Sequence, residues 1–376
     1  MRVKTIVLAT LATAALLVAA GCSLGDDDDD NGGEAAATGT DTTTTNGGGG
    51  TGGGGVLAAV RNRGTLNCGV NEAVPGFGFV SEGGDFEGFD IDFCKVVAAA
   101  VLGDPEAVEY KPLTAEQRFT ALQSGEIDVL IRNTTYTASR DGSEGANFLT
   151  TTFYDGQGMM VRDDSDYEEL EDMEGATICV LSGTTTELNL ESQFQARGVS
   201  YTPLAFEDND PLQQAFQQER CDGWTSDKSQ LAGIRSNWPD AQGGPDALRI
   251  LEVTMSKEPL GPVVRDGDDQ WGDAVNWAVI ATIQAEEFDI SSENIDEALE
   301  SDDPEVQRFL GQPVEGEPFD AGLGLPADFA VQVVRGVGNY EEIYERNVGG
   351  DSALELERGI NALWTDGGLH YPPPYR

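Results

Sequence analysis

Two stretches of this chain, residues 65–141 and 176–265, alternate short apolar strands with amphipathic helices. In the first stretch we expect strands at 65–70, 108–112 and 129–131, with a helix between each pair. Parallel neighbours need long crossover connections, so alternating strands and helices form mostly parallel sheets with helices on both faces. The alternation therefore predicts an α/β fold.

The second stretch repeats this pattern and is joined to the first by extended chain on both sides. An extended segment at 148–161 leads into it, and a loop at 257–262 with a strand at 263–265 leads back. Two such units predict two lobes with two crossovers. Ligands of open α/β sheets bind outside the carboxyl ends of the strands, so we expect a binding cleft between the lobes. The helices expected after the second unit lie at 268–287, 292–300, 304–310, 327–347 and 352–364, before an irregular tail at 365–376.

The first 55 residues are expected to lie outside the folded body. Arg2 and Lys4 precede an apolar run that ends in small residues before Cys22, which is the pattern of a secretory signal peptide at residues 1–21. The small residues directly before Cys22 resemble a bacterial lipobox, which implies cleavage there and lipidation of the thiol. A single-pass anchor is the alternative, but about 15 apolar residues are short for a span. Residues 22–55 are Gly-, Thr- and Asp-rich and predict a flexible tether.

The charge of the chain excludes some partners. The formal net charge is −45, and most of the 67 acidic residues follow the tether. Such a charge opposes nucleic acid and anionic membrane surfaces. We therefore expect no nucleic-acid partner, and membrane attachment through Cys22 alone.

Four further cysteines fit an exported protein. Cys68, Cys94, Cys179 and Cys221 form an even set, which in an oxidising compartment suggests two disulfides in one of three connectivities. Metal binding is the competing explanation, but the chain has no Cys-x-x-Cys, and its one histidine, His370, lies in the tail. We expect neither a metal nor a cofactor.

Polar residues follow four predicted strands. They occupy residues 71–77, 132–140, 182–186 and 225–227. Arg140 offers a planar fork of donors suited to a carboxylate, and the helix that starts after 182–186 can receive an anion. Asp227 supplies a negative charge. An arginine in one lobe and an acid in the other complement a zwitterion, which is the chemistry of an α-amino acid.

Six segments carry a resemblance to a known family. They are Gly64-Thr-Leu-Asn-Cys-Gly-Val70, Gly88-Phe-Asp-Ile-Asp-Phe-Cys94, Arg118-Phe-Thr-Ala-Leu-Gln-Ser-Gly-Glu-Ile-Asp128, Asn133 to Asp141, Tyr154-Asp-Gly-Gln-Gly158 and Ser182-Gly-Thr-Thr185. These segments resemble the amino-acid family of ABC-transporter solute-binding proteins (family 3), above all its general L-amino acid-binding subgroup, and the resemblance covers roughly residues 56–350. It implies the two-lobed type II periplasmic-binding-protein fold, with two mostly parallel sheets, two crossover strands as a hinge and a helical C-terminal extension.

The resemblance also implies roles for individual residues. Arg140 matches the arginine that clamps the ligand carboxylate, helped by Thr135 and Asn133. Thr184 and Thr185 match the anion-receiving helix start, and Asp227 matches the aspartate that binds the ammonium group. Phe119 matches the aromatic wall of the side-chain pocket. A second aromatic is expected from the first loop, where Ala73 stands near the family's position and Phe77 is the nearest ring.

Some of these assignments have structural alternatives. Asp227 could serve only as a helix N-cap, as could Thr184 and Thr185, because these residue types are favoured there regardless of function. Phe119 could be plain core. Arg132 stands where relatives often carry a small or hydroxylated residue, which leaves two roles open: reading the ligand side chain, or pairing within the fold.

The resemblance implies one disulfide within each lobe. Cys68 would pair with Cys94 in lobe 1, and Cys179 with Cys221 in lobe 2, so that neither bridge crosses the hinge. The expected lobe 1 comprises residues 56–160 and 259–376, and the expected lobe 2 residues 161–258. Hinge motion is expected near 157–162 and 256–264.

The function implied is a monomeric, lipid-anchored binding protein at the cell surface or in the periplasm. It would capture L-amino acids by hinge closure and deliver them to an ABC permease with its ATPase. A dehydratase of the same fold is the first rival, for which Glu72 is the best acid, since His370 is poorly placed for acid–base work. An amino-acid sensor acting on a partner receptor is the second. We expect a binding protein and no enzyme.

Overall fold

The computed structural model describes residues 55–314, 316–318 and 320–375. The expected signal peptide, Cys22 and all of the tether except Gly55 lie outside these residues. No helix in the described ranges is long and apolar enough to cross a membrane.

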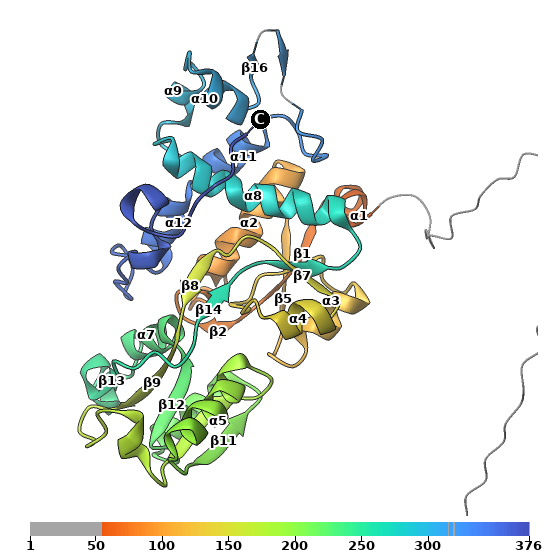
Figure 1. Cartoon of the computed structure of the whole chain (residues 1–376). Coiled ribbons are helices and arrows are strands. Elements are labelled where there is room, and N and C mark those ends of the chain that lie inside the picture. Colours follow the sequence, from red (N-terminus) through yellow and green to blue (C-terminus); the bar gives the residue numbers. More distant parts are fainter. Residues whose placement is uncertain (1–54, 315, 319, 376) are drawn as a thin grey trace, which may run out of the picture. The chain divides into compact units, whose positions relative to one another are not determined.

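The first sheet has five strands in the order β5-β1-β6-β15-β7. Figure 1 labels β1, β5 and β7 of this sheet. Strands β1 (Leu66–Val70), β5 (Val108–Pro112) and β6 (Val129–Leu130) are parallel, whereas β15 (Val263–Arg265) runs antiparallel to β6 and to β7 (Ala146–Phe148). Beside it lies a small sheet of strands β2 to β4, whose bounds are Ala73–Val74, Gly78–Val80 and Phe86–Glu87. We call the part built on the first sheet lobe 1.

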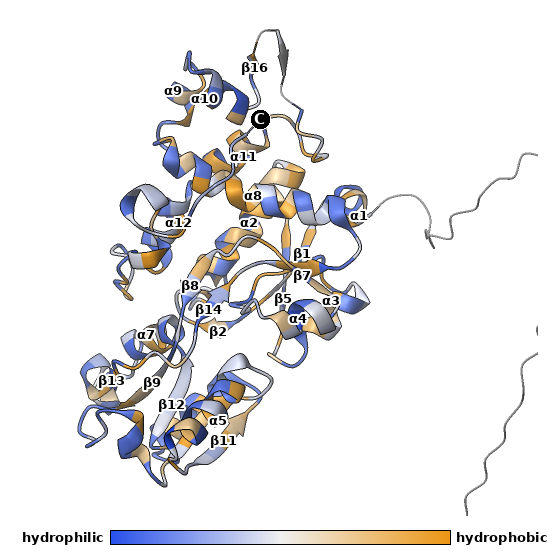
Figure 2. Cartoon of the chain, viewed as in Figure 1, coloured by the Kyte–Doolittle hydropathy of each residue, from blue (hydrophilic) through white to orange (hydrophobic). Residues whose placement is uncertain are grey.

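Helices surround the first sheet. Helix α2 (Phe89–Leu102) contacts β1, and the long helix α8 (Asp269–Glu287) contacts α2 in turn. Alanine and valine dominate the buried face of α2, which lets α8 approach closely. Figure 2 shows hydrophobic residues gathered along both helices. The remaining helices before the first crossover are α1 (Val56–Arg63), α3 (Arg118–Ser124) and α4 (Ala138–Ser143).

The second sheet repeats the order of the first, as β11-β10-β12-β9-β13. Strands β10, β11 and β12 are parallel, and β9 is antiparallel to its two neighbours β12 and β13. We call the part built on this sheet lobe 2. Its strands are β9 (Gln157–Arg162), β10 (Thr177–Leu181), β11 (Thr202–Phe206), β12 (Gly223–Asp227) and β13 (Leu248–Ile250); its α-helices are α5 (Thr185–Arg197), α6 (Asn209–Gln217) and α7 (Lys228–Ser236).

The chain crosses between the sheets twice, and the two crossings pair with each other. Strand β8 (Phe153–Asp155) and strand β14 (Glu258–Leu260) form a two-stranded antiparallel ribbon. Residues Gln157 to Val161 of β9 pair with β12 and Arg162 pairs with β13, so β9 belongs entirely to the second sheet. The expected lobe boundary after residue 160 therefore falls inside a strand, and the crossing precedes it.

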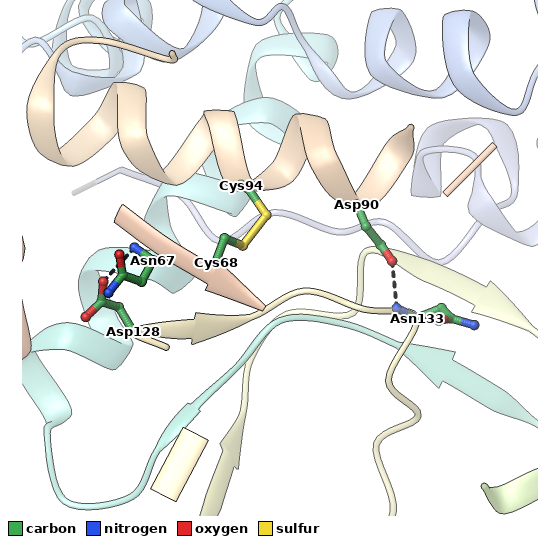
Figure 3. Close-up of a disulfide and its surroundings, with 6 residues drawn as sticks. All are labelled: Asn67, Cys68, Asp90, Cys94, Asp128 and Asn133. Atoms are coloured by element: carbon green, nitrogen blue, oxygen red, sulfur yellow. Dashed lines mark hydrogen bonds between the residues drawn. A yellow bond between two sulfur atoms is a disulfide. The ribbon is translucent and has the colours of Figure 1, made fainter. Parts of the chain in front are cut away.

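The two disulfides are those that the resemblance implied. Cys68 on β1 is bonded to Cys94 on α2 with a Cα–Cα distance of 6.2 Å (Figure 3), and Cys179 on β10 to Cys221 with 5.6 Å. Both separations are ordinary for disulfides. Each bridge lies within one lobe.

We call residues 295–375 the C-terminal extension. Its α-helices are α9 (Ile295–Ala298), α10 (Pro304–Phe309), α11 (Phe329–Gly336) and α12 (Tyr340–Asn347), with a hairpin of β16 (Pro313–Val314) and β17 (Glu317–Pro318). Helices α11 and α12 contact α2 and α8. The chain end also packs, because His370 and Tyr375 are buried.

The prediction of a helix at 352–364 was wrong. This segment runs irregularly into the 3₁₀ turns Gly359–Asn361 and Trp364–Asp366. Its polar groups bond outside the segment: Leu356 N donates to Val348 O, and the Asn361 side chain bonds to the backbone of β8. The predicted helix 327–347 is split into α11 and α12 at Gly338, whose φ of 109° no helix allows. The α/β class and the order of the other elements are as predicted.

Candidate functional site

One cavity lies where the polar strand ends of both lobes face each other. Lobe 1 contributes Asn71, Arg118, Arg132, Asn133, Thr135 and Arg140, and lobe 2 contributes Leu181, Thr184, Thr185, Thr186, Asn209, Ser226, Asp227 and Gln230. Seven of the nine predicted ligand residues are in this set. Phe119 and Phe77 are the two that are not.

The lobes are in contact around the cavity. A Cβ on Gly183 of lobe 2 would lie 2.8 Å from Glu116 Cγ, and one on Gly233 would lie 2.5 Å from Pro75 O. Arg118 Nη2 donates to Gly183 O at 3.3 Å, and the Thr135 and Thr185 hydroxyls lie 3.3 Å apart. These cross-lobe contacts mean that the structure is in a closed arrangement.

Arg140 enters the cavity from the first turn of α4. The Thr137 hydroxyl caps this helix by accepting from Arg140 N, and Arg140 Nη1 donates to Thr135 O at 3.0 Å. Its side chain is nearly buried, and burial is the main reason that the pKa of Arg140 is lowered. The rest of its guanidinium fork is available for a carboxylate.

Asp227 ends β12 at the start of α7. It stands at the N-cap position but makes no side-chain capping bond, so the interpretation as a mere cap does not hold. Its carboxylate Oδ2 instead accepts from Asn133 Nδ2 of lobe 1 at 3.2 Å. Burial, together with the nearby carboxylates of Asp155 and Glu258, raises its pKa well above the ordinary range. A cation placed beside it would favour the ionised form.

Asn133 connects the two lobes. It has a positive φ of 29°, and its backbone N donates to Asp90 Oδ2 at 2.6 Å (Figure 3). Its amide Nδ2 also lies 3.4 Å from Gln230 Oε1, and its Oδ1 accepts from Asn71. Because Asp90 fixes the backbone, the Asn133 side chain is held toward Asp227.

The two threonines at the start of α5 differ in what they do. Thr184 caps the helix by accepting from Glu187 N at 3.1 Å, and its hydroxyl donates to Leu181 O, so a capping role is present. Thr185 instead donates to Glu258 Oε2 at 2.9 Å and faces Thr135. The first N–H groups of a helix lack intrahelical acceptors, which makes this end suited to an anion.

The two predicted aromatic residues lie in different places. Phe119 is half-buried, and the guanidinium carbons of Arg118 and Arg140 lie 5.3 and 5.7 Å from its ring centroid. Its ring therefore positions two cavity arginines. Phe77 is 1% exposed and packs edge-on against Phe153 in the core, so the structure does not place it at the cavity.

Sequence reasoning missed several cavity residues. Arg118 directly precedes Phe119, and Ser226 directly precedes Asp227, so neighbours of predicted residues were overlooked. Gln230 lies three residues after Asp227 on the same helix face, a spacing that would have indicated it. Asn209 starts α6 and carries no comparable signal. It accepts from Gln230 Nε2 at 2.9 Å.

Known proteins share this chain's sequence and fold. "General L-amino acid-binding periplasmic protein AapJ" of Rhizobium johnstonii is 49% identical over 320 residues, which are 85% of this chain and 92% of that protein. "Glutamate/glutamine/aspartate/asparagine-binding protein BztA" of Rhodobacter capsulatus is 46% identical over 318 residues, 84% of this chain and 92% of that protein.

A solved structure is similar along most of the chain. It is an ABC transporter / periplasmic binding protein from Brucella ovis with glutathione bound, with a TM-score of 0.82 and 44% identity, covering 86% of this chain and 100% of that one. The family described as bacterial extracellular solute-binding proteins, family 3, matches residues 66–294. This chain therefore belongs to the bacterial extracellular solute-binding proteins of family 3.

Proposed function

We propose that this protein captures L-amino acids between its lobes as the extracytoplasmic binding component of an ABC importer. The observation that carries the proposal is the pair of opposite charges in one cavity, Arg140 from lobe 1 and Asp227 from lobe 2. The names of the relatives, general L-amino acid-binding and glutamate/glutamine/aspartate/asparagine-binding, support the ligand class.

Arg140 binds the α-carboxylate in this proposal. Its free N–H groups match the two oxygens of a carboxylate, and the Thr135 hydroxyl lies beside the cavity for a further bond. The start of α5 completes the carboxylate site from lobe 2, through the backbone N–H groups at Thr184 and Thr185. Both lobes then hold the same ligand group.

Asp227 binds the ammonium group. Burial and two neighbouring carboxylates oppose the negative charge of Asp227. An ammonium group beside it would favour the ionised form, because the opposite charges attract. Asn133, which donates to Asp227 Oδ2 at 3.2 Å, holds the carboxylate in place.

Closure occurs about the ribbon of β8 and β14, where the chain crosses between the lobes. A ligand that contacts both lobes is bound more tightly by the closed arrangement, so it shifts the population toward that form. The closed form is the one that a permease would recognise. This places the hinge at Phe153–Asp155 and Glu258–Leu260.

The setting of the protein is part of the proposal. Lipid attachment at Cys22 would hold a monomeric receptor on the periplasmic or outer face of the membrane, next to a permease and its ATPase. We propose binding and no catalysis. The relatives named above are binding proteins, and the rival catalytic acid, Glu72, is exposed and lies outside the cavity lining.

Calorimetric titration tests the function. The protein is unfolded and refolded to remove any carried ligand, then titrated with a panel of L-amino acids, of which at least one should bind. Arg140→Ala should weaken binding about a hundredfold, since it leaves a carboxylate without its bidentate partner. The matched control is Arg220→Ala, an exposed arginine of lobe 2. If no amino acid binds, the function is wrong, and if Arg140→Ala binds normally, its role is wrong.

A further inference from the structure

The cavity has more positive charge than one carboxylate requires. Arg118, Arg132 and Arg140 all line it, and their exposed fractions are 2%, 6% and 9%. None of the ion pairs formed by the described residues includes any of the three. Buried charges without partners are costly, and proteins normally retain them where a ligand completes them.

Arg118 is the least satisfied of these side chains. Its Nη2 donates across the lobes to Gly183 O, but its Nε is buried without a partner among the described residues. Burial, followed by the charges of Arg140 and Arg132, holds the pKa of Arg118 well below its usual range. Asp227 and Glu144 oppose these effects only in part, so the nearby carboxylates do not offset the arginine charges.

Arg132 is also largely unpaired. Its Nε donates to Leu113 O at 2.7 Å, and the acid that most affects it is Asp90. That acid accepts from Asn133 N, and burial raises its pKa to about 7, so it is only partly ionised near neutral pH. Because no ion pair of the described residues includes Arg132, its hydrogen bond within the fold is the one to Leu113 O.

The polar groups of an α-amino acid use only part of this site. One α-carboxylate occupies Arg140 with the start of α5, and one ammonium group occupies Asp227. Arg118 and Arg132 would remain buried and unpaired around a neutral side chain. A second carboxylate would satisfy both.

We infer that Arg118 and Arg132 read an anionic ligand side chain, so that acidic L-amino acids are the preferred ligands. The inference rests on the proposed function and deepens it. Arg140 holds the α-carboxylate, Asp227 the ammonium group, and the other two arginines the distal carboxylate. The ring of Phe119 contacts the guanidinium groups of Arg118 and Arg140 and so helps to fix their positions.

The experiment compares matched ligands. Refolded, ligand-free protein is titrated calorimetrically with L-glutamate, L-glutamine and L-norvaline, which differ in the distal group. L-Glutamate should bind about tenfold or more tightly than L-glutamine, and L-norvaline more weakly still, because a charge-assisted hydrogen bond exceeds a neutral one. Equal affinity for L-glutamate and L-glutamine would overturn the inference and leave the proposed function standing. Failure of all amino acids would overturn the function itself.

Substitutions of Arg118 and Arg132 then test whether these two residues cause the preference for L-glutamate over L-glutamine. Arg118→Met and Arg132→Met should each weaken L-glutamate binding about tenfold and L-glutamine binding less, so that the affinity ratio falls. Arg118→Lys and Arg132→Lys retain the charge and should retain part of the ratio, which guards against variants that misfold. The control is Arg162→Met, an arginine of lobe 2 that lies over the Phe216 ring at 4.7 Å, away from the cavity.

A purely structural role predicts a different result. If Arg118 only latches the lobes through Gly183, its loss should weaken L-glutamate and L-glutamine equally, and the ratio should stay that of the wild type. An unchanged ratio in both Met variants therefore contradicts the inference.

Discussion

The two lobes share a strand order but bring opposite chemistry to the cavity. The central strand of each five-stranded sheet, β6 in lobe 1 and β12 in lobe 2, leads to the cavity. The chain after β6 delivers Arg132 and Asn133, whereas β12 itself ends in Asp227, and Asn133 donates to Asp227 between them. The same position in the fold thus supplies cationic and amide groups on one side and a carboxylate on the other.

The helices that follow β1 in lobe 1 and β10 in lobe 2 also differ in the groups at their starts. In lobe 1, α2 begins beside Asp90, whose carboxylate is used internally to hold Asn133 N. In lobe 2, α5 begins with the hydroxyls of Thr184 and Thr185 at the cavity. The repeated fold therefore fixes where groups are presented, while the residue types decide what is bound. The following predictions test this division.

The disulfides should matter slightly more in lobe 2. The Cys179–Cys221 bridge spans 42 residues and the Cys68–Cys94 bridge 26. In the loop-entropy account each bridge is worth about 3 to 4 kcal/mol, and the longer loop gains more. We expect Cys179→Ala/Cys221→Ala to lower the free energy of unfolding in urea by about 4 kcal/mol, and Cys68→Ala/Cys94→Ala by a few tenths less. A larger loss of unfolding free energy in the lobe 1 variant would show that strain in the folded state or residual structure in the unfolded state, and not loop length, decides the difference.

Removing the charge of Asp227 should abolish the contribution of lobe 2 to the ammonium site. Asp227→Asn keeps the size and the contact with Asn133 but gives up the charge, so amino-acid affinity should fall about a hundredfold, or about 3 kcal/mol. Isothermal titration calorimetry measures this fall in affinity. Asp246→Asn, an exposed acid of lobe 2, is the control and should bind as the wild type does. Undiminished binding by Asp227→Asn would place the ammonium group elsewhere.

The buried acid of lobe 1 should make stability depend on pH. Burial raises the pKa of Asp90 from 3.8 to about 7, against the opposing effects of Asn133 N and Arg132. The folded state therefore holds this proton more tightly than the unfolded state, so the stability penalty is absent below the unfolded pKa. It grows as the pH rises to about 7 and is constant above that.

Asp90→Asn removes this penalty while its amide oxygen can still accept from Asn133 N. The unfolding free energy of the variant minus that of the wild type should therefore rise by about 2.6 kcal/mol from about pH 5 to about pH 8. Urea unfolding of both proteins at the two pH values gives this number. A difference that does not change with pH would contradict the cause assigned to the shift.

The sequence was informative where local pattern and fold agree. Alternating apolar strands and helices predicted the α/β class, and β5 and β15 form at the predicted residues. It failed at 352–364, where helix-forming residues such as Leu354 and Leu356 lie in irregular chain held by distant backbone partners. Local propensity cannot report such contacts, because they depend on residues far away in the sequence.

The cavity was predictable to the extent that its residues sit at strand exits. Asp227 ends β12, and Arg140 and Thr185 lie on the helices α4 and α5 that follow β6 and β10, so all three could be named from the pattern. Phe77 could not be assigned, because whether a loop ring faces a cavity or the core depends on packing against Phe153. The excess of buried arginine charge was likewise invisible, since burial and missing ion pairs are properties of the folded chain.

The two strands of the hinge also differ, because the C-terminal extension of lobe 1 is hydrogen-bonded to β8. The Asn361 side chain bonds both backbone groups of Tyr154 in β8, accepting from N at 2.7 Å and donating to O at 3.0 Å. It thus takes the place of a neighbouring strand on the edge of β8 that β14 does not cover. These bonds tie β8 to the C-terminal extension, whereas β14 is tied to another part of lobe 1, because Tyr136 N donates to Pro259 O at 2.8 Å.

Asn361→Ala should free that edge and lower the unfolding free energy by about 1 kcal/mol, the net value of a typical hydrogen bond. More diagnostic is the Tyr154 amide, whose hydrogen exchange should quicken in the variant because its acceptor is lost. Asn237→Ala, whose amide bonds to Gly233 O within lobe 2, serves as the matched control. Unchanged exchange at Tyr154 would mean that β14 alone holds the crossover, and that the extension of lobe 1 has no hold on the motion by which the lobes close.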